Sequence, residues 1–366
     1  MTGVIDLDIH PTVTGGLDPL APYLTRAQRD RLEFLGAGRE GGGFLVGRAQ
    51  MFAPNRGQRP DTVSPKGGPP CSDVDFVREH LLDRCGIDAA LMIPLQPVSA
   101  AGWTYADEAA WYVSAFNDLM RDTWMAADRR FHLAMTVSPL DPQLAASEIR
   151  RFGRTPGVLG IEVPLINIPM GQRHYYPIFE AAQELGLPII QHGLGGWDLV
   201  GVTQAAGGLP VHYAERYTLY GQIGQTQLVT MLFEGVFERF PELKVVFVEW
   251  GWTWLPSLLW RADSTWKSAR IHHPWMKKRP SEYVRDHVRF TTEPALECDD
   301  PEHLRQVVEM MGGPELLLFS TDYPHWDSEE PFTVLKGLPE ADRLRIFRDN
   351  AVDFFGSLLR LPQPVG

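Results

Sequence analysis

The sequence predicts a (β/α)8 TIM barrel, an α/β fold in which eight parallel strands alternate with helices around one core. Eight short apolar runs rich in β-branched residues recur along the chain, and a segment with helical periodicity follows each of them. This alternation is typical of a parallel sheet with crossover helices. A length of 366 residues with 44% apolar side chains suits a single barrel with a large buried core.

The strands are expected, in chain order, at Val4–His10, Asp88–Leu95, His132–Val137, Val158–Pro164, Pro188–His192, Lys244–Glu249, Val288–Thr292 and Leu316–Asp322. The helices are expected at Ser72–Cys85, Tyr105–Arg130, Pro142–Phe152, Tyr176–Leu185, Ile223–Arg239, Thr253–Ser268, Pro301–Met311 and Ala341–Leu359.

Residues at the ends of several expected helices support these bounds. Asp141 precedes a proline, which is typical of an N-cap followed by the first helical position. Ser72 and Asp75 have the form of a capping box. Gly86 and Gly186 stop helices directly before the next strand.

An open, doubly wound parallel sheet is the main alternative, because strand patterns alone do not establish closure. No GxGxxG motif follows the first strand, which weakens that alternative. No internal repeat or linker divides the chain, so we expect one domain over residues 1–366.

Two stretches dense in glycine and proline interrupt the alternation, at about residues 36–72 after the first strand and 193–221 after the fifth. Long irregular insertions in a compact domain are usually lids or binding loops. The loops that follow barrel strands form the active-site face. Both insertions are therefore expected over the C-terminal mouth of the barrel.

Charge and composition exclude several classes of partner. Lys and Arg total 34 against 46 Asp and Glu, a formal net charge of −12, so the surface repels nucleic acid. No apolar run approaches the roughly 20 residues that span a bilayer, and no basic and apolar leader begins the chain. The three cysteines lack metal-site spacing. We expect a cytoplasmic protein that acts on a small molecule.

The first strand carries three polar residues, Asp6, Asp8 and His10, at alternate positions. Residues i and i+2 share one face of a strand, so these side chains are expected to face the barrel interior. Burying carboxylates there is costly unless a metal or hydrogen bonds compensate. A hydrogen-bonded cluster without metal is the alternative.

Two further strands end in residues of the same kind. His192 lies where the fifth strand meets a glycine, and Asp322 ends the eighth strand with His325 three residues beyond. Together, Asp8, His10, His192 and Asp322 offer two carboxylates and two imidazoles at the C-terminal ends of strands. The sequence therefore predicts a mononuclear site for a divalent transition metal, with room for a water.

These motifs resemble the amidohydrolase superfamily, specifically the amidohydrolase-2 family, which is similar to aminocarboxymuconate-semialdehyde decarboxylase. The resemblance rests on the Asp-x-His of strand one, Gln191-His192-Gly193, the Phe-Pro-Glu-Leu-Lys approach to strand six, the motif from Ser320 to His325, and Asn350-Ala351. It spans nearly the whole chain.

The resemblance implies zinc or manganese bound by Asp8, His10, His192 and Asp322, with Asp322 also serving as proton shuttle. The family often has His or Glu at the position of Asp8. The shorter Asp8 is expected to hold the metal slightly deeper or more weakly.

Strand six departs from the family's decarboxylases, which carry a histidine where this chain has Glu249. A carboxylate there repels an anionic substrate unless it is protonated or paired with a cation such as Arg261. This substitution makes hydrolysis more attractive than decarboxylation. A structural ion pair is the alternative role for Glu249.

Substrate-binding residues are expected among the insertions and the tryptophans that follow strand six. Arg48 of the first insertion has a guanidinium that can clamp a carboxylate. His212 of the second insertion and Trp252 after strand six are the other candidates. An aromatic or cyclic substrate is expected.

The first functional hypothesis is a metal-dependent hydrolase, in which a metal-activated water attacks an amide, ester or lactone. Asp322 accepts the proton, and Glu249 or His325 orients the substrate. The first alternative is a metal-dependent, non-oxidative decarboxylase of an aromatic or muconate-type acid. The second is a barrel that only binds a ligand. Similar barrels often pair, so a homodimer is also expected.

Overall fold

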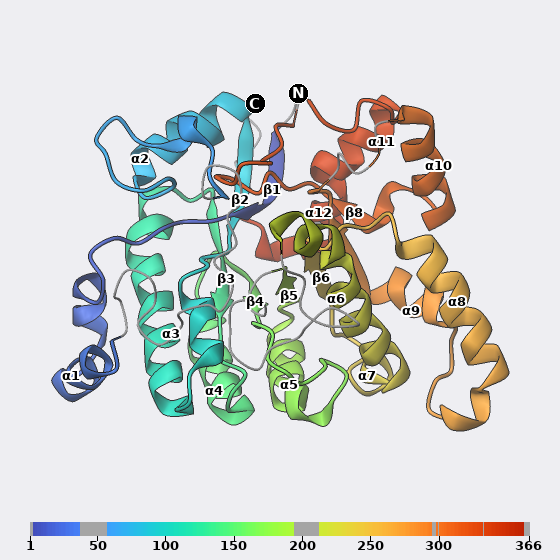
Figure 1. The fold of residues 1–366 in the computed structure, drawn as a ribbon, viewed down its shortest axis with the longest axis horizontal. Coiled ribbons are helices and arrows are strands. Elements are labelled where there is room, and N and C mark those ends of the chain that lie inside the picture. The colour runs from blue at the N-terminus through green and yellow to red at the C-terminus, as the bar shows by residue number, and fades with distance from the viewer. Residues whose placement is uncertain are drawn as a thin grey trace.

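The computed structural model describes residues 3–36, 57–193, 212–294, 298, 300–331 and 333–361. Eight parallel strands pair in chain order and form a nearly closed barrel with the helices outside it (Figure 1). The strands are β1 Val4–Ile9, β2 Ile87–Met92, β3 Phe131–Thr136, β4 Val158–Glu162, β5 Ile189–His192, β6 Val245–Val248, β7 Val288–Thr291 and β8 Leu317–Leu318. The predicted (β/α)8 barrel is confirmed, and each predicted strand overlaps the observed one.

Backbone hydrogen bonds between β1 and the segment that begins at β8 bring the two ends of the sheet together. The Leu7 N–H donates to the Phe319 carbonyl at 3.0 Å, and the His10 N–H donates to the Tyr323 carbonyl at 2.8 Å. These bonds hold the ends of the first and last strands side by side, where the predicted metal ligands lie.

The helices of the described residues are α1 Arg26–Phe34, α2 Val74–Val77, α3 Ala106–Met120, α4 Pro142–Phe152, α5 Tyr176–Leu185, α6 Tyr213–Phe233, α7 Val236–Arg239, α8 Leu255–Ser268, α9 Pro280–His287, α10 Pro301–Met311, α11 Glu340–Leu344 and α12 Asn350–Phe355. Helices α4, α5 and α10 have the predicted bounds. Helices α2, α3 and α11 continue as π-helical segments. The sequence analysis did not predict α1 or α9.

The helix ends agree with the sequence in most places. The Asp141 carboxylate accepts two backbone N–H groups at the start of α4, as predicted. Gly86 and Gly186 have φ of 63° and 66°, a left-handed conformation that glycine adopts at low cost. The prediction of a capping box at Ser72 is wrong. Asp73 caps α2, and the Ser72 hydroxyl donates to the Pro69 carbonyl instead.

The barrel interior is filled by a cluster of aliphatic side chains from seven strands, which includes Ile5 and Leu7 of β1. Ile9 packs in the larger cluster between strands and helices. The strict alternation predicted for β1 is therefore wrong. Its pairing with β2 shifts register between Asp6 and Ile9, and such an irregularity turns side chains to a different face.

The described part of the first insertion reaches the loop after β8, at the C-terminal mouth. Gln58 bridges to His325, and the Arg59 N–H donates to the Pro324 carbonyl at 2.9 Å. The second insertion was predicted to reach residue 221, but helix α6 already begins at Tyr213. The division into one domain stays a prediction.

Helix α6 contains two glycines, Gly221 and Gly224, where it comes close to the segment after β6. A Cβ on Gly224 would lie 2.9 Å from two Trp250 atoms, and one on Gly221 would lie 3.0 Å from Trp254. The absence of these side chains lets α6 lie against both tryptophans. Among the described helices, none is long and apolar enough to cross a membrane.

Candidate metal centre

The structure brings the four predicted metal ligands together, although they lie far apart in the chain. His10 Nε2 lies 3.2 Å from Asp8 Oδ1 and 2.7 Å from Asp322 Oδ1. His192 Nε2 lies 3.6 Å from Asp8 Oδ2. All four side chains are buried. They come from the C-terminal ends of β1 and β5 and from the segment after β8, the face where barrel enzymes place their active sites.

The donor atoms at this centre fit a cation. Both carboxylate oxygens of Asp8 and Oδ2 of Asp322 are buried without a hydrogen-bond partner among the described residues. His10 donates from Nδ1 to the Ile93 carbonyl at 2.8 Å, which leaves the lone pair of Nε2 facing the two carboxylates. Converging acceptors are unfavourable unless a proton or a metal lies between them. Two carboxylates and two imidazoles suit zinc or manganese.

The pKa shifts reflect mutual interactions within this cluster. Burial by itself raises the pKa of Asp8, but the imidazoles of His10 and His192 outweigh it and lower that pKa. Burial likewise opposes protonation of His192, and Asp8 and Glu249 nevertheless raise its pKa well above the usual value. Burial, and then the Glu249 carboxylate, raises the pKa of Asp322. The cluster therefore contains more negative charge than its histidines neutralise.

Asp322 and Glu249 have left-handed backbones, with φ of 57° and 62°. Residues other than glycine rarely adopt this conformation, which costs about 1–2 kcal/mol per residue. Both residues directly follow a strand or its extension, so the turn directs their side chains over the mouth. Strain of this kind is concentrated at functional sites.

Asp6 is separate from the ligand set and has a structural role. Its carboxylate accepts the Thr321 N–H at 2.9 Å and the Thr321 hydroxyl at 2.7 Å, and Oδ1 also accepts the Asp8 N–H at 3.2 Å. Burial raises the pKa of Asp6 to about 7. The alternative considered for β1, a hydrogen-bonded cluster without metal, therefore applies to Asp6. Its hydrogen bonds hold the backbone at Asp8 and at Thr321, next to the proposed ligand Asp322, in place.

The predicted catalytic residues adjoin the ligands. His325 Nδ1 lies 2.6 Å from Asp322 Oδ1, and burial lowers the pKa of His325. Glu249 Oε2 lies 3.1 Å from His192 Nε2. Arg261, suggested as the partner of Glu249, is instead exposed on α8. The pairing with Arg261 is therefore wrong, because helix α8 presents that residue to solvent.

Neither of the two predicted substrate-binding residues that the structure describes lines the cavity beside this centre. Trp252 is fully buried, and its indole N–H donates to the Thr292 carbonyl at 3.1 Å, so its role in substrate binding stays a prediction. His212 is exposed at the start of α6, where its N–H donates to Glu215. Arg48 lies outside the described residues.

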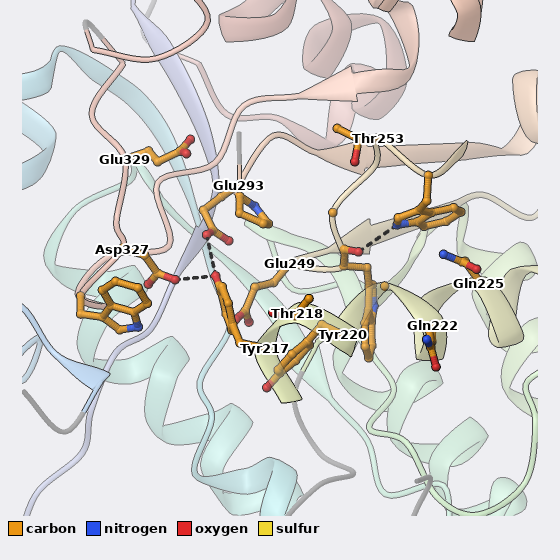
Figure 2. A pocket seen from close by; sticks show the side chains of 16 residues that line it. Tyr217, Thr218, Tyr220, Gln222, Gln225, Glu249, Thr253, Glu293, Asp327 and Glu329 are labelled. Carbon is orange, nitrogen blue, oxygen red and sulfur yellow. Dashed lines mark hydrogen bonds between the residues drawn. The ribbon is translucent and has the colours of Figure 1, made fainter. Parts of the chain in front are cut away.

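A cavity of about 810 Å³ lies over the ends of β6 and β7 and beside α6 (Figure 2). Its wall includes the aromatic residues Tyr217, Tyr220, Trp250, Trp254 and Trp326. Four acids also line it: Glu249, Glu293, Asp327 and Glu329. Trp250 and Trp254, rather than Trp252, therefore form its tryptophan wall after β6.

Glu293, which lies two residues after β7, was not predicted as a site residue. Glu249, Glu293 and Asp322 offer carboxylate oxygens that all lie within 4.8 Å of one another. Burial, and then Asp322 and Glu249, raises the pKa of Glu293 well above its usual value. The signal was present in the sequence, because Glu293 is an acid directly beyond a buried strand, as Asp322 is.

Comparison with known proteins shows the family. Residues 5–357 match the amidohydrolase family, and the chain belongs to it. Among its curated relatives is gamma-resorcylate decarboxylase of Polaromonas sp. (strain JS666), 24% identical over 77% of this chain and 87% of the relative. Another is 2-amino-3-carboxymuconate-6-semialdehyde decarboxylase of Dictyostelium discoideum, 25% identical over 78% of this chain and 77% of the relative.

A solved structure supports the fold. Dihydroxybenzoic acid decarboxylase from Polaromonas sp. JS666, with bound manganese and the inhibitor 2-nitroresorcinol, superposes with a TM-score of 0.65 and 20% identity. The match covers 99% of this chain and 100% of that one.

These comparisons confirm the predicted family and the prediction of an enzyme. They favour the decarboxylase alternative over the hydrolase that was our first hypothesis. The expected metal is consistent with the manganese in the solved structure and with the triad Asp8, His10 and His192 in this one.

Proposed function

We propose that this chain is a divalent-metal-dependent carboxy-lyase that releases carbon dioxide from an aromatic or related cyclic acid. The observation that carries the proposal is the convergence of Asp8, His10, His192 and Asp322 at the mouth of the barrel. The decarboxylases among its relatives support the reaction class. The adjacent cavity, with its aromatic wall, suits a ring-bearing substrate.

Asp8, His10, His192 and Asp322 would hold zinc or manganese. When bound, such an ion would polarise the substrate carboxylate and fix its position. The buried carboxylate of Asp6 keeps these ligands in place through its bonds to Thr321 and Asp8.

Asp322 is the proposed proton donor. His10 and His325 both contact its Oδ1, so an imidazole can exchange a proton with this carboxyl group. The bond between the ring carbon and the carboxylate carbon breaks, and its electron pair stays on the ring carbon. The proton from Asp322 forms the new C–H bond, and carbon dioxide leaves.

His325 is the proposed route by which Asp322 regains its proton. Its side chain is 15% exposed, whereas that of Asp322 is 1% exposed, so His325 is the group of the pair that solvent reaches. Burial lowers the pKa of His325, which favours a neutral imidazole that can accept and pass a proton.

The test is to reconstitute chelator-treated protein with manganese or zinc and to incubate it with a panel of ortho-hydroxylated aromatic acids. Metal-dependent release of carbon dioxide, together with loss of the substrate carboxylate, is the expected result. Metal-dependent turnover of esters, amides or lactones, with no carbon dioxide from any acid, would contradict the proposal.

Hydrolysis is the second candidate function, and the carboxylate of Glu249 favours it. Glu249 contacts His192 and is 7% exposed, so it lies close to any substrate at the proposed metal. A negative charge at this position repels an anionic acid but not a neutral ester or amide. In this reaction Asp322 would accept a proton from water and transfer it to the leaving group. A small aromatic or cyclic substrate, action in the cytoplasm and a homodimer also remain predictions.

A further inference from the structure

The cavity beside the metal centre has one sign of charge. The described residues that line it include four carboxylates, and none of these residues is Lys, Arg or His. Among the described residues, ion pairs such as those of Arg59 with Asp61 and Glu330 lie outside the lining of this cavity. An acidic cavity with low-dielectric walls concentrates cations and disfavours anions.

A single divalent metal does not account for this charge. Asp8 supplies one negative charge, and Asp322 supplies a second whenever it has given up its proton, so these two ligands need no more than one divalent cation. His192 would bind the metal as a neutral imidazole, so it would no longer serve as a cationic partner of Glu249. Glu249 and Glu293 then remain as additional acidic groups at the inner end of the cavity, and a cationic ligand beside them would favour their ionised forms.

Glu293 provides a second, independent observation. It is 1% exposed, and its Oε2 has no hydrogen-bond partner among the described residues. Its Oε1 lies 3.3 Å from the Tyr217 hydroxyl, which also contacts Asp327 (Figure 2). A phenol has one proton to donate, so Tyr217 satisfies only one of these two carboxylates. A buried carboxylate oxygen is thus left directed at the cavity.

Aromatic rings continue from these acids along the cavity wall. Ring centroids of Tyr217 and Tyr220 lie 5.6 Å apart, and those of Tyr220 and Trp250 lie 5.8 Å apart. Trp326 lies 6.2 Å from Tyr217 on the other side. The faces of such rings attract ammonium groups, and they also bind the apolar body of a ligand.

We propose that the inner end of this cavity binds an organic cation, namely a protonated amine carried by a ring-bearing substrate, with Glu293 and Glu249 as its counterions. The inference deepens the proposed function and rests on it for the assumption that the cavity receives the substrate. The substrate is then an aromatic or cyclic acid that also carries an alkylamine, since an amine bonded directly to an aromatic ring is neutral at pH 7. The amine offsets the repulsion that Glu249 exerts on the carboxylate.

A second divalent ion is the competing occupant, because Glu249, Glu293 and Asp322 could hold one. The aromatic wall and the volume of about 810 Å³ favour an organic cation, since a metal ion needs neither.

The experiment compares benzylamine with benzyl alcohol, which has a similar shape but no charge at neutral pH. Binding of each to the manganese-loaded protein is measured by calorimetry. Benzylamine is expected to bind at least about tenfold more tightly. Glu293→Gln is expected to lower the affinity for benzylamine about tenfold or more and to leave that for benzyl alcohol unchanged. Glu234→Gln, which removes an exposed charge at the far end of α6, is the matched control and should change neither.

Equal affinity for the amine and the alcohol in the unmodified protein would overturn the proposal. Equal loss of both ligands in Glu293→Gln would also overturn it, since the residue would then only shape the cavity. Elemental analysis showing two metals per chain, one of them lost in Glu293→Gln, would assign the acids to a second metal instead. If Glu293→Gln does not fold, Glu249→Gln, which removes the other proposed counterion, takes its place with the same expected result.

The binding measurement does not depend on turnover. Selective binding of benzylamine without carbon dioxide release from any acid would contradict only the proposed reaction. Carbon dioxide release from acids that lack an amine, with no preference for benzylamine, would contradict only this inference.

Discussion

Glu249 Oε2 lies 3.1 Å from His192 Nε2, so the acid at the end of β6 contacts a predicted metal ligand. Glu249 stands at the position where the resemblance described above implies a histidine in the family's decarboxylases. Its left-handed backbone and buried side chain fix this contact. Our proposals for the reaction and for the charge of the substrate therefore both depend on this residue.

Glu249→Gln is expected to strengthen the binding of a simple anionic acid such as salicylate. Two like charges about 4 Å apart repel each other by about 4 kcal/mol at an effective dielectric constant of 20, and the bound metal ion would offset part of this. We therefore expect about a tenfold lower Kd for salicylate in the metal-loaded variant, measured by calorimetry. Glu234→Gln is the control for net charge. An unchanged Kd would show that Glu249 is already neutral or compensated.

Asp322→Asn is expected to lower kcat for carbon dioxide release by about 10²- to 10⁴-fold, because the amide cannot supply the proton. Metal content must be measured in the same sample, since Asp322 is also a predicted ligand. Asp300→Asn removes an exposed carboxylate at the start of α10 and should retain full activity. Retention of kcat in Asp322→Asn would exclude it as proton donor.

Protonation of His132 is expected to destabilise the fold at acidic pH. This buried imidazole donates from Nδ1 to the Arg130 carbonyl and accepts the Arg360 N–H at Nε2, so it is bonded as the neutral form. Burial lowers its pKa to about 4 from 6.5. The unfolded chain therefore binds the proton more readily, and stability falls as pH decreases from 6.5 toward 4, by up to about 3 kcal/mol.

Urea unfolding of the chelator-treated protein at pH 7 and pH 5 measures this effect. His132→Gln, which has no imidazole to titrate, should lose less stability between these values than the unmodified chain. The same loss in both proteins would show that other groups cause the acid sensitivity.

Gly224→Ala is expected to destabilise the protein by about 1–3 kcal/mol, as overpacking in a dense core usually does. The new methyl group would lie 2.9 Å from Cβ and Cγ of Trp250, against which α6 packs. Chemical denaturation gives the free energy of unfolding. Thr226→Ala, on the exposed side of the same helix, should be nearly neutral. A neutral Gly224→Ala would contradict the close approach of α6 to Trp250.

The fold and the ligand set were predictable because their signals are local. Each strand is a short apolar run, and His192 and Asp322 stand where such a run meets a turn. Strand order in a barrel follows chain order, so residues at these ends meet at one mouth. The alternation predicted for β1 failed because sequence spacing does not reveal a register shift.

The acidic cavity was largely beyond prediction from the sequence. Tyr217 belongs to a helix whose start was placed ten residues too late, at Ile223 rather than Tyr213. Its contact with Asp327 joins residues 110 positions apart. The choice of Trp252 over Trp250 and Trp254 also depended on the turn after β6, where Glu249 and Gly251 both have positive φ.

Metal content is the most direct test of the central claim. After dialysis against manganese and then metal-free buffer, elemental analysis should find about one ion per chain. Loss of a residue that only hydrogen-bonds to a metal ligand typically weakens metal affinity by roughly 10- to 100-fold. Asp8→Ala and His192→Ala remove proposed ligands themselves, so each should weaken metal affinity by more than that. His132→Gln, which changes a histidine paired with Arg130 and Arg360 instead, should retain the metal. Equal metal content in all four proteins, or none in the unmodified chain, would contradict the claim that these side chains bind one cation.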